Sequence, residues 1–156
     1  MTSNEKTITK FYTAFANADA KTMCECYHPN VQFIDPAFGL LIEKDVCQMW
    51  KMLIEKSKGT IKVVFSDVKA DEYMGSAKWI ATYQFSKTNR TVINKVHSKF
   101  HFKDGLIVKH SDHFDFWKWS KQAFGIKGYL FGWTGFFQRK IEEQALASLK
   151  KYKNAN

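Results

Sequence analysis

The sequence predicts an α+β fold in which three N-terminal helices pack on one face of a strongly curved, mostly antiparallel sheet. Apolar residues recur with the helical period before Gly59 and with the strand period of two after it. The chain has 156 residues, of which 45% are hydrophobic and 16% aromatic, which is enough for one packed core. We therefore expect a single domain over residues 1–156, with its core at about 3–116 and an extension at 117–156.

The first part of the chain carries helix signals separated by helix breakers. The expected helices cover about 3–17, 19–27 and 43–57, with a short strand at 31–35. Thr2 and Glu5 have the spacing of a capping box at the start of the first helix. Asp19 suits the N-cap of the second helix, which Pro29 ends, and Gly59 is a natural stop for the third. The buried stripe of the first helix consists of Ile8, Phe11, Tyr12 and Phe15.

The second part of the chain reads as a meander of long strands followed by a helix. The expected strands are 61–70, 77–86, 91–103 and 106–116. They are separated at Gly75, at residues 87–90 and at Asp104-Gly105, which is a strong hairpin signal. Four glycines make 117–135 irregular in this interpretation, and a last helix follows at about 136–152.

Polar residues interrupt the strand faces that alternation turns inward. They are Asp35, Asn94, Ser98, His110 and Asp112, and each stands where a plain core would have an aliphatic residue. A buried carboxylate without a partner costs several kcal/mol or becomes neutral through a shift of its pKa. Together these residues predict a pocket that holds water or a ligand. Taken singly, each can also be a polar core residue whose hydrogen bonds are satisfied.

Charge and hydropathy narrow the range of partners. The net charge is +9, and much of the excess follows Asp115. A basic tail can attract nucleic acid or anionic lipid, but no groove-reading motif accompanies it, so we do not expect nucleic-acid binding. No apolar run approaches the roughly 18 residues of a membrane span. The N-terminus lacks the pattern of a signal peptide, so we expect a cytoplasmic protein.

Several short motifs together resemble one known superfamily. They are Phe11-Tyr12, Asp19, Met23, Tyr27-His28-Pro29, Val31-x-Phe33-x-Asp35-Pro36-x-x-Gly39 and Asp104-Gly105-x-Ile107-x-x-His110-x-Asp112-x-Phe114-Asp115. Their order and spacing resemble the nuclear transport factor 2-like superfamily, in particular its ketosteroid isomerase and SnoaL-type polyketide cyclase branches. The resemblance covers roughly residues 3–116, and the segment from Trp117 to Thr134 looks like a feature of an uncharacterised SnoaL-like subgroup.

The resemblance implies a cone-shaped sheet around the helices, with a ligand cavity at its wide end and a homodimer formed through the outer sheet face. It matches Asp35 to the general base of ketosteroid isomerases and Tyr12 to their oxyanion-hole tyrosine. Asp112 matches an acid/base aspartate of the cyclases, and His110 shares its face. Ser98 stands where the isomerases have a protonated aspartate, and its hydroxyl is a weaker donor. Steroid isomerisation is therefore not the expected reaction.

The hypothesis that follows is a small-molecule binding protein or a cofactor-free acid/base enzyme of isomerase, cyclase or hydrolase type. Its ligand would be a small apolar carbonyl or epoxide compound, and its catalytic residues Asp35, His110, Asp112 and Tyr12. The expected cavity lining is Phe15, Phe33, Trp50, Trp79, Tyr83, Asn94, Ser98, Phe100 and Phe114. The alternative is a non-catalytic interaction module that binds a protein through its aromatic C-terminal segment.

Each expected site residue also has a structural interpretation. Asp35 can brace the turn at its Asp-Pro step, Tyr12 can be a core residue, and His110 with Asp112 can form a structural pair. No metal site is expected, because His97 and His101 lie on the outward face about 13 Å apart. No cofactor fingerprint is present either.

Overall fold

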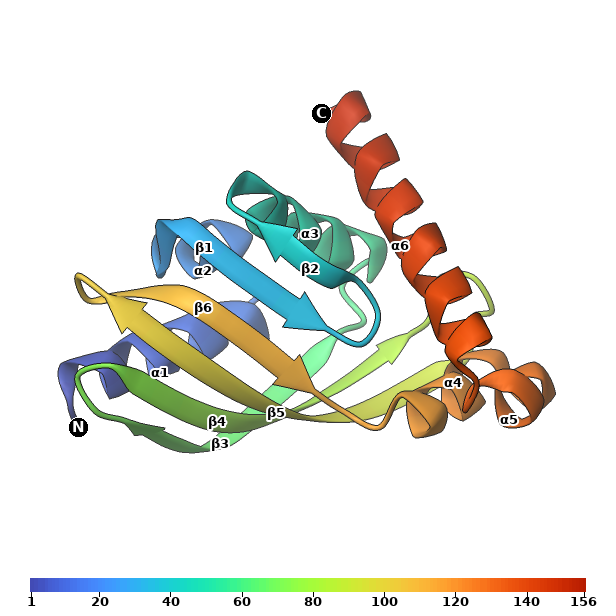
Figure 1. Cartoon of the computed structure of the whole chain (residues 1–156), viewed down its shortest axis with the longest axis horizontal. Helices are drawn as coiled ribbons and strands as arrows, with labels where there is room; N and C mark the ends of the chain where they lie inside the picture. Colours follow the sequence, from blue (N-terminus) through green and yellow to red (C-terminus); the bar gives the residue numbers. More distant parts are fainter.

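Six helices and six strands make up the computed structural model, which describes residues 1–156. In chain order they are α1 (Ser3–Ala16), α2 (Ala20–Glu25), β1 (Tyr27–Asp35), β2 (Gly39–Ile42), α3 (Lys44–Lys56), β3 (Lys62–Ala70), β4 (Met74–Gln84), β5 (Thr91–Lys103), β6 (Leu106–His113), α4 (Phe116–Phe124), α5 (Ile126–Phe131) and α6 (Gly135–Ala155). All strands form one sheet in the order β2-β1-β6-β5-β4-β3 (Figure 1). Only the β1–β6 pair is parallel, so the predicted α+β fold with a mostly antiparallel sheet is confirmed.

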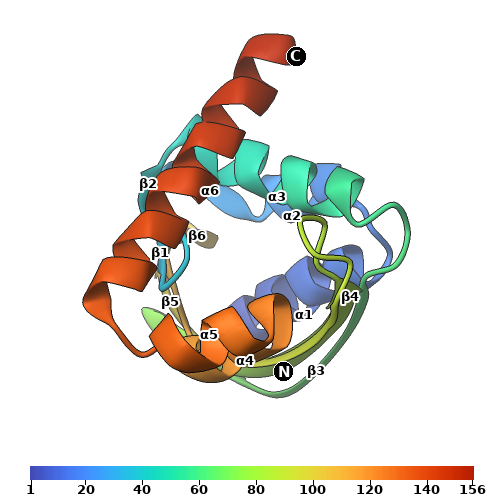
Figure 2. The ribbon, with the colours of Figure 1, turned by 90° about the vertical axis from the view of Figure 1, so that its right-hand side faces the viewer.

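The sheet curves around the N-terminal helices. Seen along the long axis of the molecule, β3, β4, α3 and α6 surround the interior, and α4 and α5 lie at the near end (Figure 2). The main core fills the space between the sheet and α1 to α3, with Phe11, Phe15 and Trp50 from the helices packed against strand residues such as Trp79 and Phe100. A smaller apolar cluster under α4 and α6 continues from it.

The N-terminal helix forms as its sequence predicts. Thr2 and Glu5 make a reciprocal capping box, with the Thr2 hydroxyl 3.1 Å from the Glu5 amide and the Glu5 carboxylate 2.8 Å from the Thr2 amide. The predicted stripe of Ile8, Phe11, Tyr12 and Phe15 is buried. This helix therefore brings Tyr12 into the centre of the fold.

The strand prediction holds along β5 and needs correction at the beginning of β6. The even residues of β5 face inward as expected, from Val92 to Phe102. On β6 we expected Leu106 and Val108 to share the inner face with His110, but Ile107 is the buried residue. A register shift opposite His101 and Phe102 reverses the alternation there.

Two shorter elements also differ from the sequence interpretation. The first strand begins at Tyr27 instead of 31 and forms a hairpin with β2, which we did not predict. Gly75, expected as a break between strands, lies inside β4 and pairs with Phe100. A side chain there would press on Ile8, so the glycine allows the first helix to approach the sheet.

Most of the segment 117–135 is helical, which corrects the prediction that its glycines make it irregular. It contains most of α4 and all of α5. A Cβ atom at Gly128 would collide with the carbonyl group of Ser120, and one at Gly132 would meet the Ser120 side chain. These glycines therefore allow α5 to pack backbone to backbone on α4. No helix of the molecule is both long and apolar enough to cross a bilayer.

Candidate functional site

A cavity of about 190 Å³ lies between the inner face of the sheet and α3, α4 and α6. Seventeen of the 27 residues that line it are hydrophobic, so a ligand inside would be held mainly by apolar contact. Lys56, Gln84, Lys87 and Gln144 belong to the lining and are also exposed. They mark where the cavity opens to solvent, between the end of α3, the β4–β5 turn and α6.

Two carboxylates stand in this apolar wall, Asp35 and Asp112. They come from the parallel strands β1 and β6, in which Phe33 pairs with His110 and Ile34 with Ser111. The next residues along the two strands are Asp35 and Asp112. Neighbouring strands lie about 4.8 Å apart, so the register brings the two carboxylates onto one side of the sheet next to each other.

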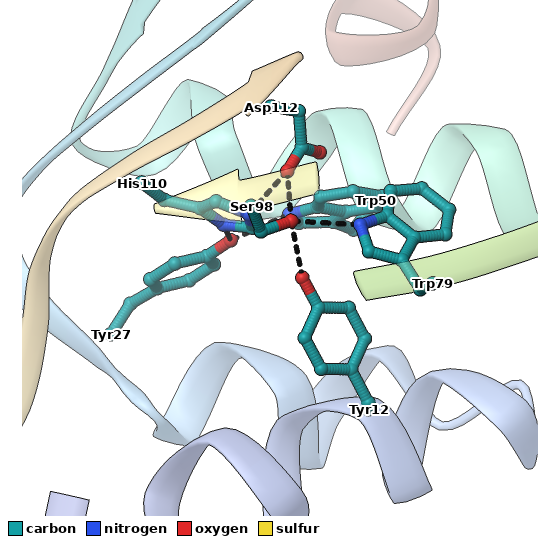
Figure 3. A network of polar contacts seen from close by, with 7 residues as sticks. All are labelled: Tyr12, Tyr27, Trp50, Trp79, Ser98, His110 and Asp112. Carbon is teal, nitrogen blue, oxygen red and sulfur yellow. Dashed lines mark hydrogen bonds and ion pairs between the residues drawn. The ribbon is translucent and has the colours of Figure 1, made fainter. Parts of the chain in front are cut away.

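Asp112 is held by Ser98 from the adjacent strand. The Ser98 hydroxyl donates a hydrogen bond to Asp112 Oδ1. It also accepts two, from the Tyr12 hydroxyl at 2.7 Å and from Trp79 Nε1 at 2.8 Å (Figure 3). A hydroxyl has one hydrogen and two lone pairs, so Ser98 is fully used. Burial raises the pKa of Tyr12 well above 10, and its hydroxyl therefore stays a donor.

His110 holds the same carboxylate oxygen from the other side. Its Nε2 lies 2.8 Å from Asp112 Oδ1, and its Nδ1 lies 2.8 Å from the hydroxyl of Tyr27 (Figure 3). Trp50 Nε1 donates to that hydroxyl at 2.9 Å, and burial raises the pKa of Tyr27 well above 10. The arrangement that gives every hydrogen an acceptor has Tyr27 donating to Nδ1 and Nε2–H donating to Asp112.

All hydrogen bonds of this network thus run toward one atom, Asp112 Oδ1. Two hydrogen bonds to one carboxylate oxygen fix the orientation of the whole carboxylate group. Its second oxygen, Oδ2, has no protein partner among the hydrogen bonds of the structure and belongs to a residue of the cavity wall. Every side-chain nitrogen or oxygen atom that is fully buried has a hydrogen-bond partner, so Oδ2 is not fully buried and is open to the cavity.

Asp35 has different surroundings. Its Oδ1 accepts hydrogen bonds from the amides of Ala37 at 3.0 Å and Phe38 at 2.6 Å, so it does brace the β1–β2 turn. Its pKa is raised to about 7, mainly by burial and in part by the negative charge of Asp112, while the two amides oppose the shift. With a pKa of about 7, the Asp35 carboxyl group is partly protonated near neutral pH and can exchange its proton there.

The structure separates the expected site residues into a cavity wall and a layer behind it. On the wall lie Asp35, Asp112, Phe15, Trp50, Trp79, Tyr83, Asn94 and Phe114. Behind the wall, buried and outside the cavity lining, lie Tyr12, His110, Ser98, Phe33 and Phe100. Tyr12 and His110 therefore do not contact a ligand in the cavity. They act on it indirectly, Tyr12 through its hydrogen bond to Ser98 and His110 through its hydrogen bond to Asp112.

Sequence reasoning missed two groups of residues. The first is Tyr27, which links Trp50 to His110, and only its place in the Tyr-His-Pro motif singled it out. The second is the part of the wall that the C-terminal extension supplies, with Trp119 and Phe124 from α4 and Ile141 from α6. The helical spacing of apolar residues in 116–124 was the signal from which this part of the wall could have been predicted. No three His, Cys, Asp or Glu side chains are grouped closely enough to hold a metal ion.

Comparisons with known proteins agree with this architecture. The model of the SnoaL-like domain matches residues 8–110. The fold is similar to that of Bal32a from a soil-derived mobile gene cassette, with a TM-score of 0.68 and 21% identity over 78% of this chain and 96% of that one. A candidate polyketide cyclase from Xanthomonas campestris gives a TM-score of 0.63 and 14% identity, again over 78% of this chain and 96% of that one.

A third solved structure, a nuclear transport factor 2-like protein of unknown function from Burkholderia pseudomallei, has a TM-score of 0.66 and 16% identity over 80% of this chain and 99% of that one. No curated protein matches the sequence. At these identities the solved structures show a shared fold, and the domain model shows the family. The chain belongs to the SnoaL-like family of the nuclear transport factor 2-like superfamily.

Proposed function

We propose that this protein is a cofactor-free acid/base enzyme that acts on a small apolar carbonyl or epoxide compound bound in its cavity. The observation that carries the proposal is the pair Asp35 and Asp112, two carboxyl groups with contrasting surroundings in one apolar wall. Two titratable groups whose surroundings favour different protonation states are suited to act as acid and base in one reaction. The similarity in fold to a candidate polyketide cyclase supports this type of chemistry.

Asp112 is the base in this mechanism. Ser98 and His110 occupy one of its oxygens and fix the orientation of the carboxylate. The other oxygen can accept a proton from a carbon next to the substrate carbonyl. Tyr12, Tyr27, Trp50 and Trp79 act as positioning residues, because none of them donates to Asp112 directly. Tyr12 and Trp79 donate to Ser98, whereas Tyr27 bonds to His110 and itself accepts from Trp50.

Asp35 is the acid. In its protonated form it donates its proton to the carbonyl oxygen while Asp112 takes the proton from carbon, which yields a neutral enol. An isomer forms when Asp112 returns its proton to a different carbon while Asp35 takes back the enol proton. A ring closes when the enol carbon attacks a second carbonyl group, whose oxygen takes the proton from Asp112 while Asp35 takes back the enol proton. With an epoxide, Asp112 takes a proton from water and Asp35 protonates the oxygen that leaves, which yields a diol.

The proposal is tested by proton exchange without knowledge of the natural substrate. We would incubate the protein with 2-tetralone in deuterated water, follow loss of the proton signals next to the carbonyl by NMR, and use styrene oxide hydrolysis as a second assay. Asp112→Asn should lower the enzyme-dependent rate at least about 100-fold, because an amide cannot accept the proton. The amide oxygen can still accept from Ser98 and His110, so the fold should be retained.

The pH profile tests the second carboxyl group. Since Asp35 must be protonated and its pKa is about 7, the wild-type rate should fall as the pH rises above 7. In Asp35→Asn this fall should disappear and the maximal rate should be lower. Asp67→Asn, on the exposed side of β3, is the matched control. Equal exchange rates in the wild type, Asp35→Asn and Asp112→Asn would contradict the enzyme and leave a binding protein.

The remaining expectations about the whole protein stay predictions. They are the single domain over 1–156, the cytoplasmic location and the homodimer through the outer face of the sheet. The exposed Val64 of β3 and Ile93 of β5 lie on that face and support the dimer. The interaction-module alternative is favoured by one observation, the exposed aromatic residues after α4.

A further inference from the structure

Six large apolar side chains are exposed within eleven residues at one end of the molecule. We call this surface the aromatic tip, and it consists of Ile126, Tyr129, Leu130, Phe131, Trp133 and Phe136. It covers α5, the loop after it and the first turn of α6, at the end of the long axis away from the N-terminus (Figure 1). Phe136 is 69% and Ile126 79% exposed. Contiguous exposure of this kind marks an interaction site.

The packing of α5 explains why these side chains point outward. Gly128 and Gly132 face Ser120 on α4, where no larger residue would fit. The helix thus presents its smallest residues to the protein and its largest apolar residues to water, the reverse of an ordinary surface helix. Close packing on α4 requires the glycines, but nothing in that contact requires aromatic residues on the opposite side.

The rest of the aromatic tip is held in place by local hydrogen bonds. Trp133 Nε1 donates to the carbonyl of Leu130 at 3.0 Å, and the Thr134 hydroxyl accepts from the amide of Phe137 at 3.1 Å as the cap of α6. Phe137 then packs inward while Phe136 remains outside. The aromatic rings are therefore displayed by an ordered segment, which lowers the entropic cost of binding.

The charge around the aromatic tip has one sign. Residues 116–141 contain no Asp or Glu and five basic residues, Lys118, Lys121, Lys127, Arg139 and Lys140. None of the five takes part in an ion pair of the structure. Two lie against exposed rings: Lys121 is 4.2 Å from the centre of Trp117, and Lys140 is 5.6 Å from that of Phe136.

We propose that the aromatic tip binds the surface of a membrane that contains anionic lipids. Trp, Tyr and Phe side chains insert at the boundary between headgroups and acyl chains, and Lys and Arg contact the anionic headgroups. The combination of apolar rings with uncompensated positive charge fits this occupant better than a protein surface, which would need acidic and apolar groups in matching positions. The inference uses neither Asp35 nor Asp112 and stands independently of the proposed reaction.

The experiment is binding of the 156-residue chain to vesicles, measured by flotation. Vesicles of phosphatidylcholine alone are compared with vesicles that contain phosphatidylcholine and phosphatidylglycerol at about 3:1. The protein should bind the anionic vesicles at least about 10-fold more tightly, and high salt should weaken binding. Trp133→Ser/Phe136→Ser and, separately, Lys127→Glu/Lys140→Glu should each lower the affinity at least about 10-fold.

Tyr73→Ser/Met74→Ser is the matched control. These side chains are also large, apolar and exposed, but Tyr73 lies in the β3–β4 turn and Met74 begins β4, beside the N-terminus and at the opposite end of the molecule. Binding of this control should equal that of the wild type. Three results would overturn the proposal: no preference for anionic vesicles, binding to a DNA oligonucleotide without binding to vesicles, or a dimer that dissociates in Trp133→Ser/Phe136→Ser while no form binds vesicles.

Discussion

Two regions of the molecule place polar and apolar side chains in opposite ways. They are the cone, formed by residues 3–113, and the C-terminal extension, formed by 116–155. In the cone, a serine, a histidine and a carboxylate are buried among aromatic rings. In the extension, aromatic rings stand in water on α5 while glycines and a serine fill the contact with α4. Each region departs from the ordinary rule that apolar residues lie inside and polar residues outside.

The difference shows which interactions each region must satisfy. Polar groups in the cone are tolerated because each hydrogen has an acceptor, from Trp50 through Tyr27 and His110 to Asp112. The exposed apolar side chains of the aromatic tip, unlike the buried Trp119 and Phe137 of the same extension, gain no burial within this molecule. Hydrogen bonds within the chain therefore explain the buried polar groups of the cone. The exposed rings of the aromatic tip are explained by the proposed membrane surface.

The comparison is tested most strongly within the extension itself. Trp119 is buried and donates to the Tyr83 hydroxyl at 2.8 Å, whereas Trp133 is 68% exposed. Trp119→Ala should lower the free energy of unfolding by about 3–5 kcal/mol, and Trp133→Ala should change it by less than about 0.5 kcal/mol. Urea denaturation of both variants measures this. Similar losses in the two would mean that the aromatic tip is part of the core.

A somewhat smaller effect is expected in the cone. Ser98→Ala leaves the Tyr12 hydroxyl, the Trp79 indole and Asp112 each without one partner, and we expect a loss of about 3 kcal/mol. Ser111→Ala on the neighbouring strand removes a hydroxyl that has no such partners and should cost less than about 0.5 kcal/mol. If urea denaturation gave the same stability for both variants, the network would not stabilise the fold.

The smallest effect concerns the protonation of Asp35. Its pKa is about 7 in the folded protein, above the ordinary value of 3.8, so folding favours the protonated form. The corresponding stability is present below about pH 4 and is lost as the pH rises through 7. Asp35→Asn should therefore gain stability relative to the wild type over that range, by about 2 kcal/mol after allowance for its partial exposure. Its amide oxygen can still accept from Ala37 and Phe38.

Thermal or urea unfolding of both proteins at a series of pH values measures this difference. Asp67→Asn serves as the control for removal of one exposed carboxylate. A stability difference between Asp35→Asn and the wild type that stayed constant from pH 4 to pH 8 would show that the Asp35 carboxyl has no raised pKa. It would also remove the acid from the proposed mechanism.

The sequence by itself determined the elements and most of their faces. The helical period of Ile8, Phe11, Tyr12 and Phe15 and the strand period of β5 depend on local geometry, so they could be read without knowledge of the fold. The same alternation turned Ser98 and Asp112 inward. The family followed from the order of short motifs, which the match over residues 8–110 bears out.

Only the tertiary structure decided which groups meet. Ile107 faces inward because of a register shift between β5 and β6. Residues 126–131 are helical because Gly128 fits against Ser120. His110 does not line the cavity, because Asp112 lies between it and the cavity. Contacts of this kind join residues far apart in the chain. Periodicity reports how one segment meets water and cannot report which segment covers it.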